Sequence, residues 1–268
     1  LLDRAEGLYE ELVENRKQLK PALTNLKLIY QHEKDWSKSL DVSRRLEKLG
    51  DREQGRDQAH FLCELAEAAL AEGHIDKAGE LLEQALKANP QSFRPLLIQA
   101  RIAAEQGRHD DAIVLYKKIA DEHPAFIGEV LEPMHAIFIR SDRQEAWFDW
   151  LRETSARKKN LSVLLQMTSE IAEREGFATA TDYLTSELSD APRLAGVHRL
   201  IRMRMAQKGD QRSEFLELIE QLLQRLLKEQ SAYQCHRCGF TTRTLHWQCP
   251  GCRSWGSMLP RESSNRTS

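Results

Sequence analysis

Four cysteines near the C-terminus are the residues of this chain best suited to chemistry. They are Cys235, Cys238, Cys249 and Cys252, and their spacing is C-x2-C-x10-C-x2-C. Two residues between cysteines let one tight turn present both thiolates to the same ion, and two such turns complete a tetrahedral shell of four sulfurs. We therefore predict that these four side chains bind one metal ion.

The residue types leave the identity of the metal open between zinc and iron, because both accept four thiolates. Zinc is the default, and its role would be structural, since a closed four-cysteine shell leaves no position for a substrate. Two disulfides would need an oxidising compartment, and the chain shows no secretory signal. His236 and His246 could replace a thiolate, but four cysteines already complete the set. Cys63 stands alone, and we expect it to pack between helices or to line a groove.

The elements that precede the cysteines form a repeat of 34 residues. Apolar residues recur within it at helical spacing, a glycine marks the turn between two helices, and a proline ends the second helix. One such helix pair cannot bury its own apolar face, so neighbouring pairs must stack. The matched positions are Leu62 and Leu96, Ala66 and Ala100, Ala69 and Ala103, Gly73 and Gly107, Asp76 and Asp110, Ala78 and Ala112, and Pro90 and Pro124.

This pattern resembles the tetratricopeptide repeat. Segments 59–92 and 93–126 fit it best, 20–53 and 161–194 fit less well, and 127–160 and 195–228 fit poorly. Residues 1–19 supply only a second helix. The predicted fold is all-α: a superhelical tetratricopeptide solenoid over 1–232, a small four-cysteine β module of the rubredoxin-like or zinc-ribbon type over 233–258, and a flexible polar tail over 259–268.

Charge and motifs narrow the functional classes. The formal net charge is −2, with +3 on residues 233–258, +1 on the tail and therefore −6 on residues 1–232. The acidic body would repel phosphate, so no nucleic-acid partner is expected, although a nucleic-acid-binding zinc ribbon stays as an alternative. A Gly-rich phosphate loop, a His-Glu-x-x-His motif and a nucleophile–base motif are all absent from the sequence, which favours a non-enzymatic protein.

A repeat solenoid is most often a scaffold for other proteins. The chaperone-tail clamp of some tetratricopeptide proteins needs Lys and Asn at two positions of the first helix of a repeat. In this chain, those two positions hold Leu97 and Arg101 in one repeat and Leu131 and His135 in another. The clamp is therefore rejected. The mixed apolar and charged lining suits a folded or helical client, and these four residues are the candidate client-binding groove.

The metal module is expected to pack on the solenoid. The last helical pattern runs to about Lys228, and only residues 229–232 separate it from Tyr233, without a Gly- or Ser-rich linker. A module of this size buries little core, so metal and docking must stabilise it. Trp247, Trp255 and Phe240 are the candidate docking residues, and the alternative is that they fill the core of the module itself.

The two parts together resemble the lipopolysaccharide assembly protein B family (LapB, also called YciM). Tyr233-x-Cys-x-x-Cys-Gly-Phe and Trp247-x-Cys-Pro-x-Cys-Arg-x-Trp carry this resemblance and also that to rubredoxin knuckles. Arg253 replaces the usual glycine, and the ten-residue spacer is shorter than in rubredoxins that carry electrons. These departures keep iron open as the metal but argue against a redox role.

The resemblance implies a regulator of lipopolysaccharide biosynthesis at the cytoplasmic face of the bacterial inner membrane. An N-terminal membrane helix, absent from this chain, would anchor it, in keeping with a first segment that has the pattern of a helix interior. The partners implied are the FtsH membrane protease, the LpxC deacetylase that it degrades, and an inner-membrane regulatory sensor protein. A general protein-interaction scaffold is the broader alternative.

Overall fold

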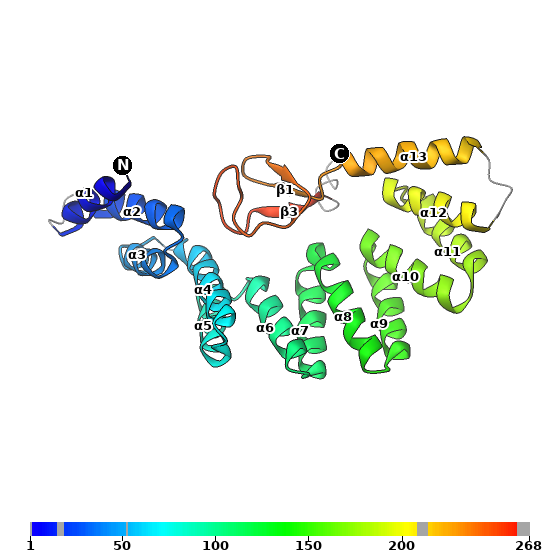
Figure 1. Ribbon diagram of the computed structural model, residues 1–268, viewed down its shortest axis with the longest axis horizontal. Coiled ribbons are helices and arrows are strands. Elements are labelled where there is room, and N and C mark those ends of the chain that lie inside the picture. The colour runs from blue at the N-terminus through cyan, green and yellow to red at the C-terminus, as the bar shows by residue number, and fades with distance from the viewer. Residues whose placement is uncertain (1, 15–18, 52, 208–213, 262–268) are drawn as a thin grey trace. The chain divides into compact units, whose positions relative to one another are not determined.

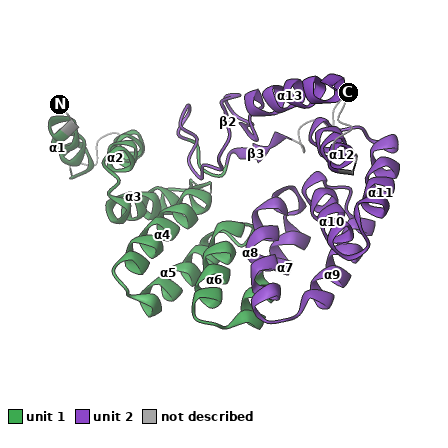
Figure 2. Ribbon diagram, turned by 45° about the vertical axis from the view of Figure 1, so that its right-hand side comes forward, with its two compact units in different colours: residues 1–115, 254–256 green, residues 116–253, 257–268 purple. Residues whose placement is uncertain are grey.

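The computed structural model describes residues 2–14, 19–51, 53–207 and 214–261 (Figure 1). Within these ranges the chain forms thirteen α-helices, one short 3-10 helix and a three-stranded sheet. It divides into two compact units, of which unit 1 comprises residues 1–115 and 254–256 and unit 2 comprises 116–253 and 257–268 (Figure 2). No helix within the described ranges is both long and apolar enough to cross a membrane.

Unit 1 consists of helices that pack on their neighbours in the chain, as the repeat predicts. Its helices are α1 (Leu2–Glu14), α2 (Leu19–Glu33), α3 (Trp36–Lys48), α4 (Gln54–Ala71), α5 (Ile75–Ala88), α6 (Phe93–Glu105) and the first half of α7 (His109–Glu122). The repeat alanines Ala66, Ala78 and Ala100 are fully buried, because small side chains let two helices approach closely. Cys63 is also fully buried, which agrees with the packing role expected for it.

Unit 2 consists of further helices and the three-stranded sheet. After α7, its elements are η1 (Pro124–Phe126), α8 (Gly128–Arg140), α9 (Gln144–Arg157), α10 (Leu161–Arg174), α11 (Phe177–Asp190), α12 (Leu194–Gln207), α13 (Glu214–Glu229), β1 (Tyr233–Cys235), β2 (Thr241–Thr242) and β3 (Met258–Pro260). Segments 127–160 and 195–228, where the repeat pattern is weakest, therefore also form two helices each. In the first of them, large aromatic side chains fill the core. Trp147 is fully buried and stacks on Trp150 with 5.4 Å between ring centroids.

Several turns between paired helices share one backbone conformation. Gly73 and Gly107 have φ of 81° and 74°, the left-handed conformation that the sequence predicts for them. Lys34 and Asp142 adopt the same conformation at φ of 60° and 54°, although neither is a glycine. The backbone N–H of Asp142 donates to the carbonyl of Ile139 at 3.1 Å, as that of Gly73 donates to Leu70 at 3.0 Å. Because these bonds satisfy the last carbonyls of the helix, the turn forms even where no glycine marks it.

Arg94 on α6 is a charged residue inside the core of unit 1. Its side chain is 2% exposed and donates to the carboxylates of Glu64 at 2.7 Å and Glu67 at 2.6 Å, both on α4. A buried cation is tolerated only when it is paired and hydrogen-bonded, and removing one partner of such a group typically costs about 3–5 kcal/mol. This ion pair therefore holds α4 and α6 in one relative position.

The C-terminal sheet is antiparallel, with the strand order β2-β1-β3. Gln234 lies opposite Thr241 on one side and Leu259 on the other. Strand β3 continues through Pro260, so the sheet extends two residues beyond the module boundary expected at 258. The rest of the expected tail, 262–268, lies outside the described residues.

Candidate metal centre

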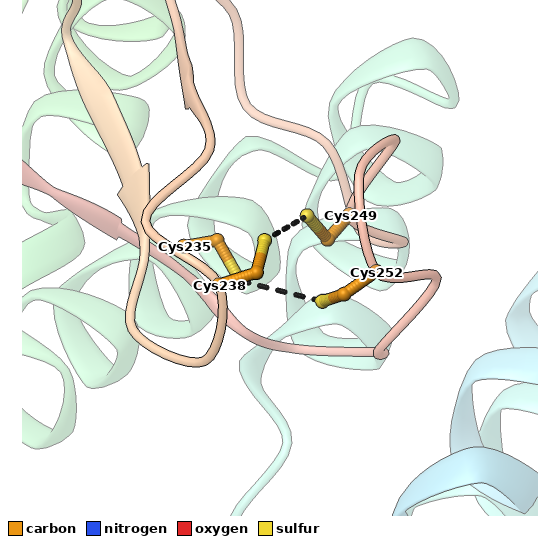
Figure 3. A group of neighbouring side chains, drawn as sticks. All are labelled: Cys235, Cys238, Cys249 and Cys252. Atoms are coloured by element: carbon orange, nitrogen blue, oxygen red, sulfur yellow. Dashed lines mark hydrogen bonds between the residues drawn. The ribbon is translucent and has the colours of Figure 1, made fainter.

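The four predicted cysteines come together at one end of the sheet in unit 2 (Figure 3). Cys235 is the last residue of β1, and the other three follow in turns. Their sulfur atoms all lie within 4.8 Å of one another. The Sγ atoms of Cys235 and Cys252 are 3.7 Å apart, and those of Cys238 and Cys249 are 3.6 Å apart. In the described residues, this is the cluster that gathers three or more metal-ligating side chains.

These separations fit a metal shell and do not fit disulfides. A disulfide joins sulfurs at about 2.05 Å, and all four cysteines are free thiols. Four thiolates around zinc at about 2.3 Å form a tetrahedron whose edges are about 3.8 Å long. The observed separations match those edges, so the four cysteines form a metal-binding site.

Each pair of cysteines is held by a tight turn with the same hydrogen bonding. The N–H of Gly239 donates to the carbonyl of Cys235 at 2.9 Å, and the N–H of Arg253 donates to that of Cys249 at 2.8 Å. Gly239 has φ of 76° and Arg253 has φ of 57°. Arg253 therefore takes the left-handed conformation that glycine supplies in the first turn, at some cost in free energy because its Cβ crowds the following carbonyl.

The electrostatics of the cluster favour thiolate at Cys235. Burial raises the pKa of Cys235, but hydrogen bonds from the Ser257 hydroxyl and from the backbone N–H groups of Cys238 and Arg237 outweigh it and lower the pKa to about 6. At Cys238 the N–H of Phe240 lowers the pKa, yet burial and the neighbouring sulfurs raise it to about 12. A thiolate at one cysteine therefore disfavours deprotonation of the neighbouring thiols by charge repulsion. A divalent cation offsets this repulsion by binding all four sulfurs as thiolates.

The two histidines of the module are not ligands in this arrangement. The Nδ1 atom of His236 lies 2.9 Å from the carbonyl oxygen of Ser257, and the Nε2 atom of His246 lies 3.2 Å from the hydroxyl of Thr244. Neither ring belongs to the cluster of metal-ligating groups. The four-sulfur shell predicted from spacing is thus the arrangement observed.

The sheet packs on helices of its own unit through residues that no motif in the sequence marks. The hydroxyl of Tyr233 donates to the carboxylate of Glu129 on α8, and the guanidinium of Arg243 donates to the carbonyl of Lys228 on α13. Burial, together with the hydrogen bond to Glu129 and its negative charge, raises the pKa of Tyr233. The only hint in the sequence is the short connection before Tyr233, which keeps the sheet near the last helix.

The three candidate docking residues have different environments. Trp255 belongs to unit 1 and is 4% exposed. Its indole N–H donates to Gln31 on α2 at 2.9 Å, and its ring stacks on His60 of α4 with 5.0 Å between centroids. Trp247 is half-buried, and Phe240 is 38% exposed. Of the three, Trp255 is therefore the residue whose side chain is enclosed by helices.

The side chain of Trp255 completes an aromatic cluster in unit 1. It meets Trp36 of α3 and Phe61 of α4 edge-on, with ring centroids 5.7 Å and 5.8 Å away. Gly256 follows with φ of 58°, and a Cβ at that position would lie 3.1 Å from Nε2 of His60. Glycine therefore suits this position, because its φ is positive and because a Cβ would crowd the histidine ring.

The candidate groove residues differ in their exposure. On α6, Leu97 is half-buried, and Arg101 is exposed and lies 3.6 Å from Glu67. On α8, the side chain of His135 is 32% exposed and lies 3.3 Å from Glu170, whereas Leu131 is 5% exposed. Leu131 therefore belongs to the core of unit 2, and the other three residues offer surface to a partner.

Comparisons with known proteins agree with both parts of the chain. A family model described as rubredoxin metal binding domain matches residues 233–260, and one for the tetratricopeptide repeat matches 63–125. Lipopolysaccharide assembly protein B of Escherichia coli K12 is 28% identical over 261 residues, which cover 97% of this chain and 67% of that protein. The protein of the same name from Haemophilus influenzae is 28% identical over 259 residues, 96% of this chain and 65% of its own length.

The chain is therefore similar along nearly its whole length to proteins named lipopolysaccharide assembly protein B. Solved structures are similar to the chain only at a low level. A structure of pilF from Pseudomonas aeruginosa has a TM-score of 0.42 at 17% identity and covers 79% of this chain and 93% of that one. A tetratricopeptide protein from Cytophaga hutchinsonii has a TM-score of 0.43 at 12% identity, with coverage of 78% and 80%. The likeness of the chain to known proteins is thus carried by the sequence matches.

Proposed function

We propose that this chain is a non-enzymatic adaptor that regulates lipopolysaccharide biosynthesis by bringing the LpxC deacetylase to the FtsH protease. The observation that carries the proposal is the match along 97% of the chain to relatives named lipopolysaccharide assembly protein B. The match includes the helical repeats and the four-cysteine module. Its place of action would be the cytoplasmic face of the inner membrane, with a membrane sensor protein as antagonist.

The chemistry of the metal centre supports an adaptor. Four cysteines close the coordination shell, so a bound ion would have no free position for substrate or water. We propose zinc as the ion and a structural role for it, while iron would fit the same sulfurs. On this basis the module over 233–258 is a folded element that presents a surface, attached to the repeat region over 1–232.

An adaptor of this kind works through surfaces and concentration. Two proteins bound to one body meet at a raised effective concentration, provided that both can bind at once. Confinement to a membrane would raise that concentration further. We propose that the accessible side chains of Leu97 and Arg101 on α6 and of His135 on α8 contact the client.

The test combines a binding assay with one charge reversal. Purified chain loaded with zinc is titrated with LpxC, and Arg101→Glu is expected to weaken binding about tenfold, as the loss of an interface arginine can. The fold should persist, because Arg101 is exposed and its ion pair with Glu67 contributes little to stability. Arg152→Glu on α9 is the control, since this side chain is 66% exposed and pairs with Asp149 in the same helix.

The function itself is tested in cells that lack the natural adaptor. A membrane-anchored form of this chain should shorten the lifetime of LpxC in the presence of FtsH, and the Cys235→Ser variant should not. If substitutions at the exposed positions of α6 and α8 leave the affinity for LpxC unchanged, the client binds elsewhere on the chain. Failure of the zinc-loaded, anchored protein to bind LpxC at all would overturn the adaptor proposal.

A further inference from the structure

Unit 2 contains a cavity of about 800 Å³ that the metal centre does not use. The 3-10 helix η1, the first residues of α8 and α10, the end of α13 and residues next to β1 and β3 line it. Its volume lies in the range of sites for small molecules, about 300–1,000 Å³. Many of the lining residues are polar or charged, and Phe126, Leu227 and Pro260 contribute apolar surface.

The charge of the lining is strongly positive. Five cationic side chains contribute to it: Arg157, Lys158, Lys159, Arg193 and Arg261. Glu129 is the one acidic residue of the lining, and its carboxylate accepts the hydrogen bond of Tyr233. This local excess runs against the net charge of −6 on residues 1–232. A concentration of cations in a mostly acidic body is expected to attract anions to this cavity.

The cations differ in how they are held. The ammonium of Lys158 donates to the carbonyl of Ala120 and to Asp121 at 2.8 Å, so it ties the loop to α7. Arg157 lies 3.8 Å from the same Asp121, and half of its side chain is exposed. Arg193 donates to the backbone carbonyl of Lys159 at 3.2 Å, which holds its guanidinium beside the 157–160 loop. Lys158 therefore supports the wall of the cavity, and the others present charge to it.

Two helix N-termini add to the positive potential. Helix α8 begins at Gly128 and α10 begins at Leu161, and they are 13 and 14 residues long. Asn160 caps α10 by accepting from the N–H of Ser162 at 2.8 Å. A Cβ on Gly128 would lie 3.1 Å from the hydroxyl oxygen of Ser162. Glycine at 128 therefore lets the two positive helix ends approach each other closely.

From this arrangement we propose that the cavity binds a small ligand that carries phosphate groups. Guanidinium groups bind phosphate oxygens through two parallel hydrogen bonds, and Arg157, Arg193 and Arg261 supply three of them around one cavity. Lys159 adds an exposed ammonium. The apolar part of the lining would contact the non-phosphate part of the ligand. This site lies beyond the proposed adaptor function and does not depend on it.

Inorganic pyrophosphate is the probe for the phosphate chemistry. Isothermal titration of the zinc-loaded chain should show saturable binding, and the double variant Lys159→Gln/Arg193→Gln should weaken it at least about tenfold, or about 1.4 kcal/mol. The control Lys77→Gln/Lys87→Gln removes the same net charge from exposed positions of α5 and should change the affinity less than about twofold. Should Arg193 prove necessary for folding, Lys159→Glu reverses one exposed charge and should weaken binding by itself.

A second arm distinguishes a lipid headgroup from a free phosphorylated solute. Vesicles of phosphatidylcholine with and without phosphatidylglycerol are sedimented with the protein. If the protein sediments only with the anionic vesicles, and if this capture is lost in the double variant and reversed by pyrophosphate, the ligand is a lipid headgroup. If pyrophosphate binding saturates but the vesicles do not capture the protein, the ligand is a free phosphorylated solute. Equal loss of pyrophosphate binding in the pocket and control variants would overturn the proposal. It would also be overturned if the protein bound neither pyrophosphate nor the anionic vesicles.

Discussion

His60 on α4 couples the stability of unit 1 to pH. Its ring is 4% exposed and stacks on the indole of Trp255. Burial, with smaller contributions from the positive charges of Arg94 and Arg56, lowers the pKa of His60 to about 3 from an ordinary value of 6.5. The folded protein therefore keeps this imidazole neutral at pH values where the unfolded chain protonates it.

The sign and size of the effect follow from proton linkage. Because the folded pKa is depressed, the stabilisation is complete above about pH 6.5 and is lost as pH falls toward 3. Each pH unit in that window costs about 1.4 kcal/mol, so the free energy of unfolding should fall by about 2 kcal/mol between pH 7.5 and pH 5. Glu64 and Glu67 pair with Arg94, and the pH window stops above the range where carboxylates ordinarily titrate.

Urea unfolding of the zinc-loaded chain, followed by circular dichroism at pH 7.5, 6.5, 5.5 and 5.0, measures this loss. His60→Phe keeps an aromatic ring beside Trp255 and removes the titrating group, so its pH dependence should be shallower by about 2 kcal/mol over this range. Acid effects on the four cysteines are common to both proteins and cancel in the difference. His32→Phe is the control, because solvent reaches that exposed imidazole in the folded and unfolded chain alike. Parallel pH profiles of the parent protein and His60→Phe would refute the burial argument.

Two further predictions concern the metal module. Elemental analysis should find about one zinc or iron ion per chain. The ion should be lost in Cys235→Ser, because three sulfurs leave the coordination shell open, and retained in Cys63→Ala, because the buried thiol of Cys63 lies outside the cluster. A Cys235→Ser protein that keeps its metal and melts normally would contradict the assignment. In thermal melts, Arg253→Gly should raise the stability of the metal-loaded module by up to about 1 kcal/mol, since the φ of 57° at this residue suits glycine. Gly239→Ala should lower the stability, because alanine is strained at a φ of 76°. Destabilisation by Arg253→Gly would show that the arginine side chain contributes more to stability than its backbone strain costs.

The features that could be predicted from the sequence are those that depend on near neighbours in the chain. The spacing of the four cysteines is such a feature, because the reach of a tight turn decides whether two thiolates face one ion. The repeat of 34 residues is another, since helical periodicity and the turns at Gly73 and Gly107 are local. The left-handed turns at Lys34 and Asp142 were missed, because these residues carry no mark of that conformation, and the hydrogen bonds of the helix ends impose it.

Contacts between residues far apart in the chain could not be predicted from the sequence and are seen only in the folded protein. Trp255 lies against Gln31 and His60, about two hundred positions away in the chain, and Tyr233 bonds to Glu129. The burial of Leu131, which the sequence placed in the client groove, likewise depends on how neighbouring helices pack. The phosphate cavity draws its charges from separate helices and from the end of the sheet, none of which forms a motif in the sequence. The spacing of residues along the chain determines local geometry, such as which side chains share one face of a helix. The contacts between distant residues depend instead on how stacked helices enclose a side chain, and no period or motif in a single sequence predicts them.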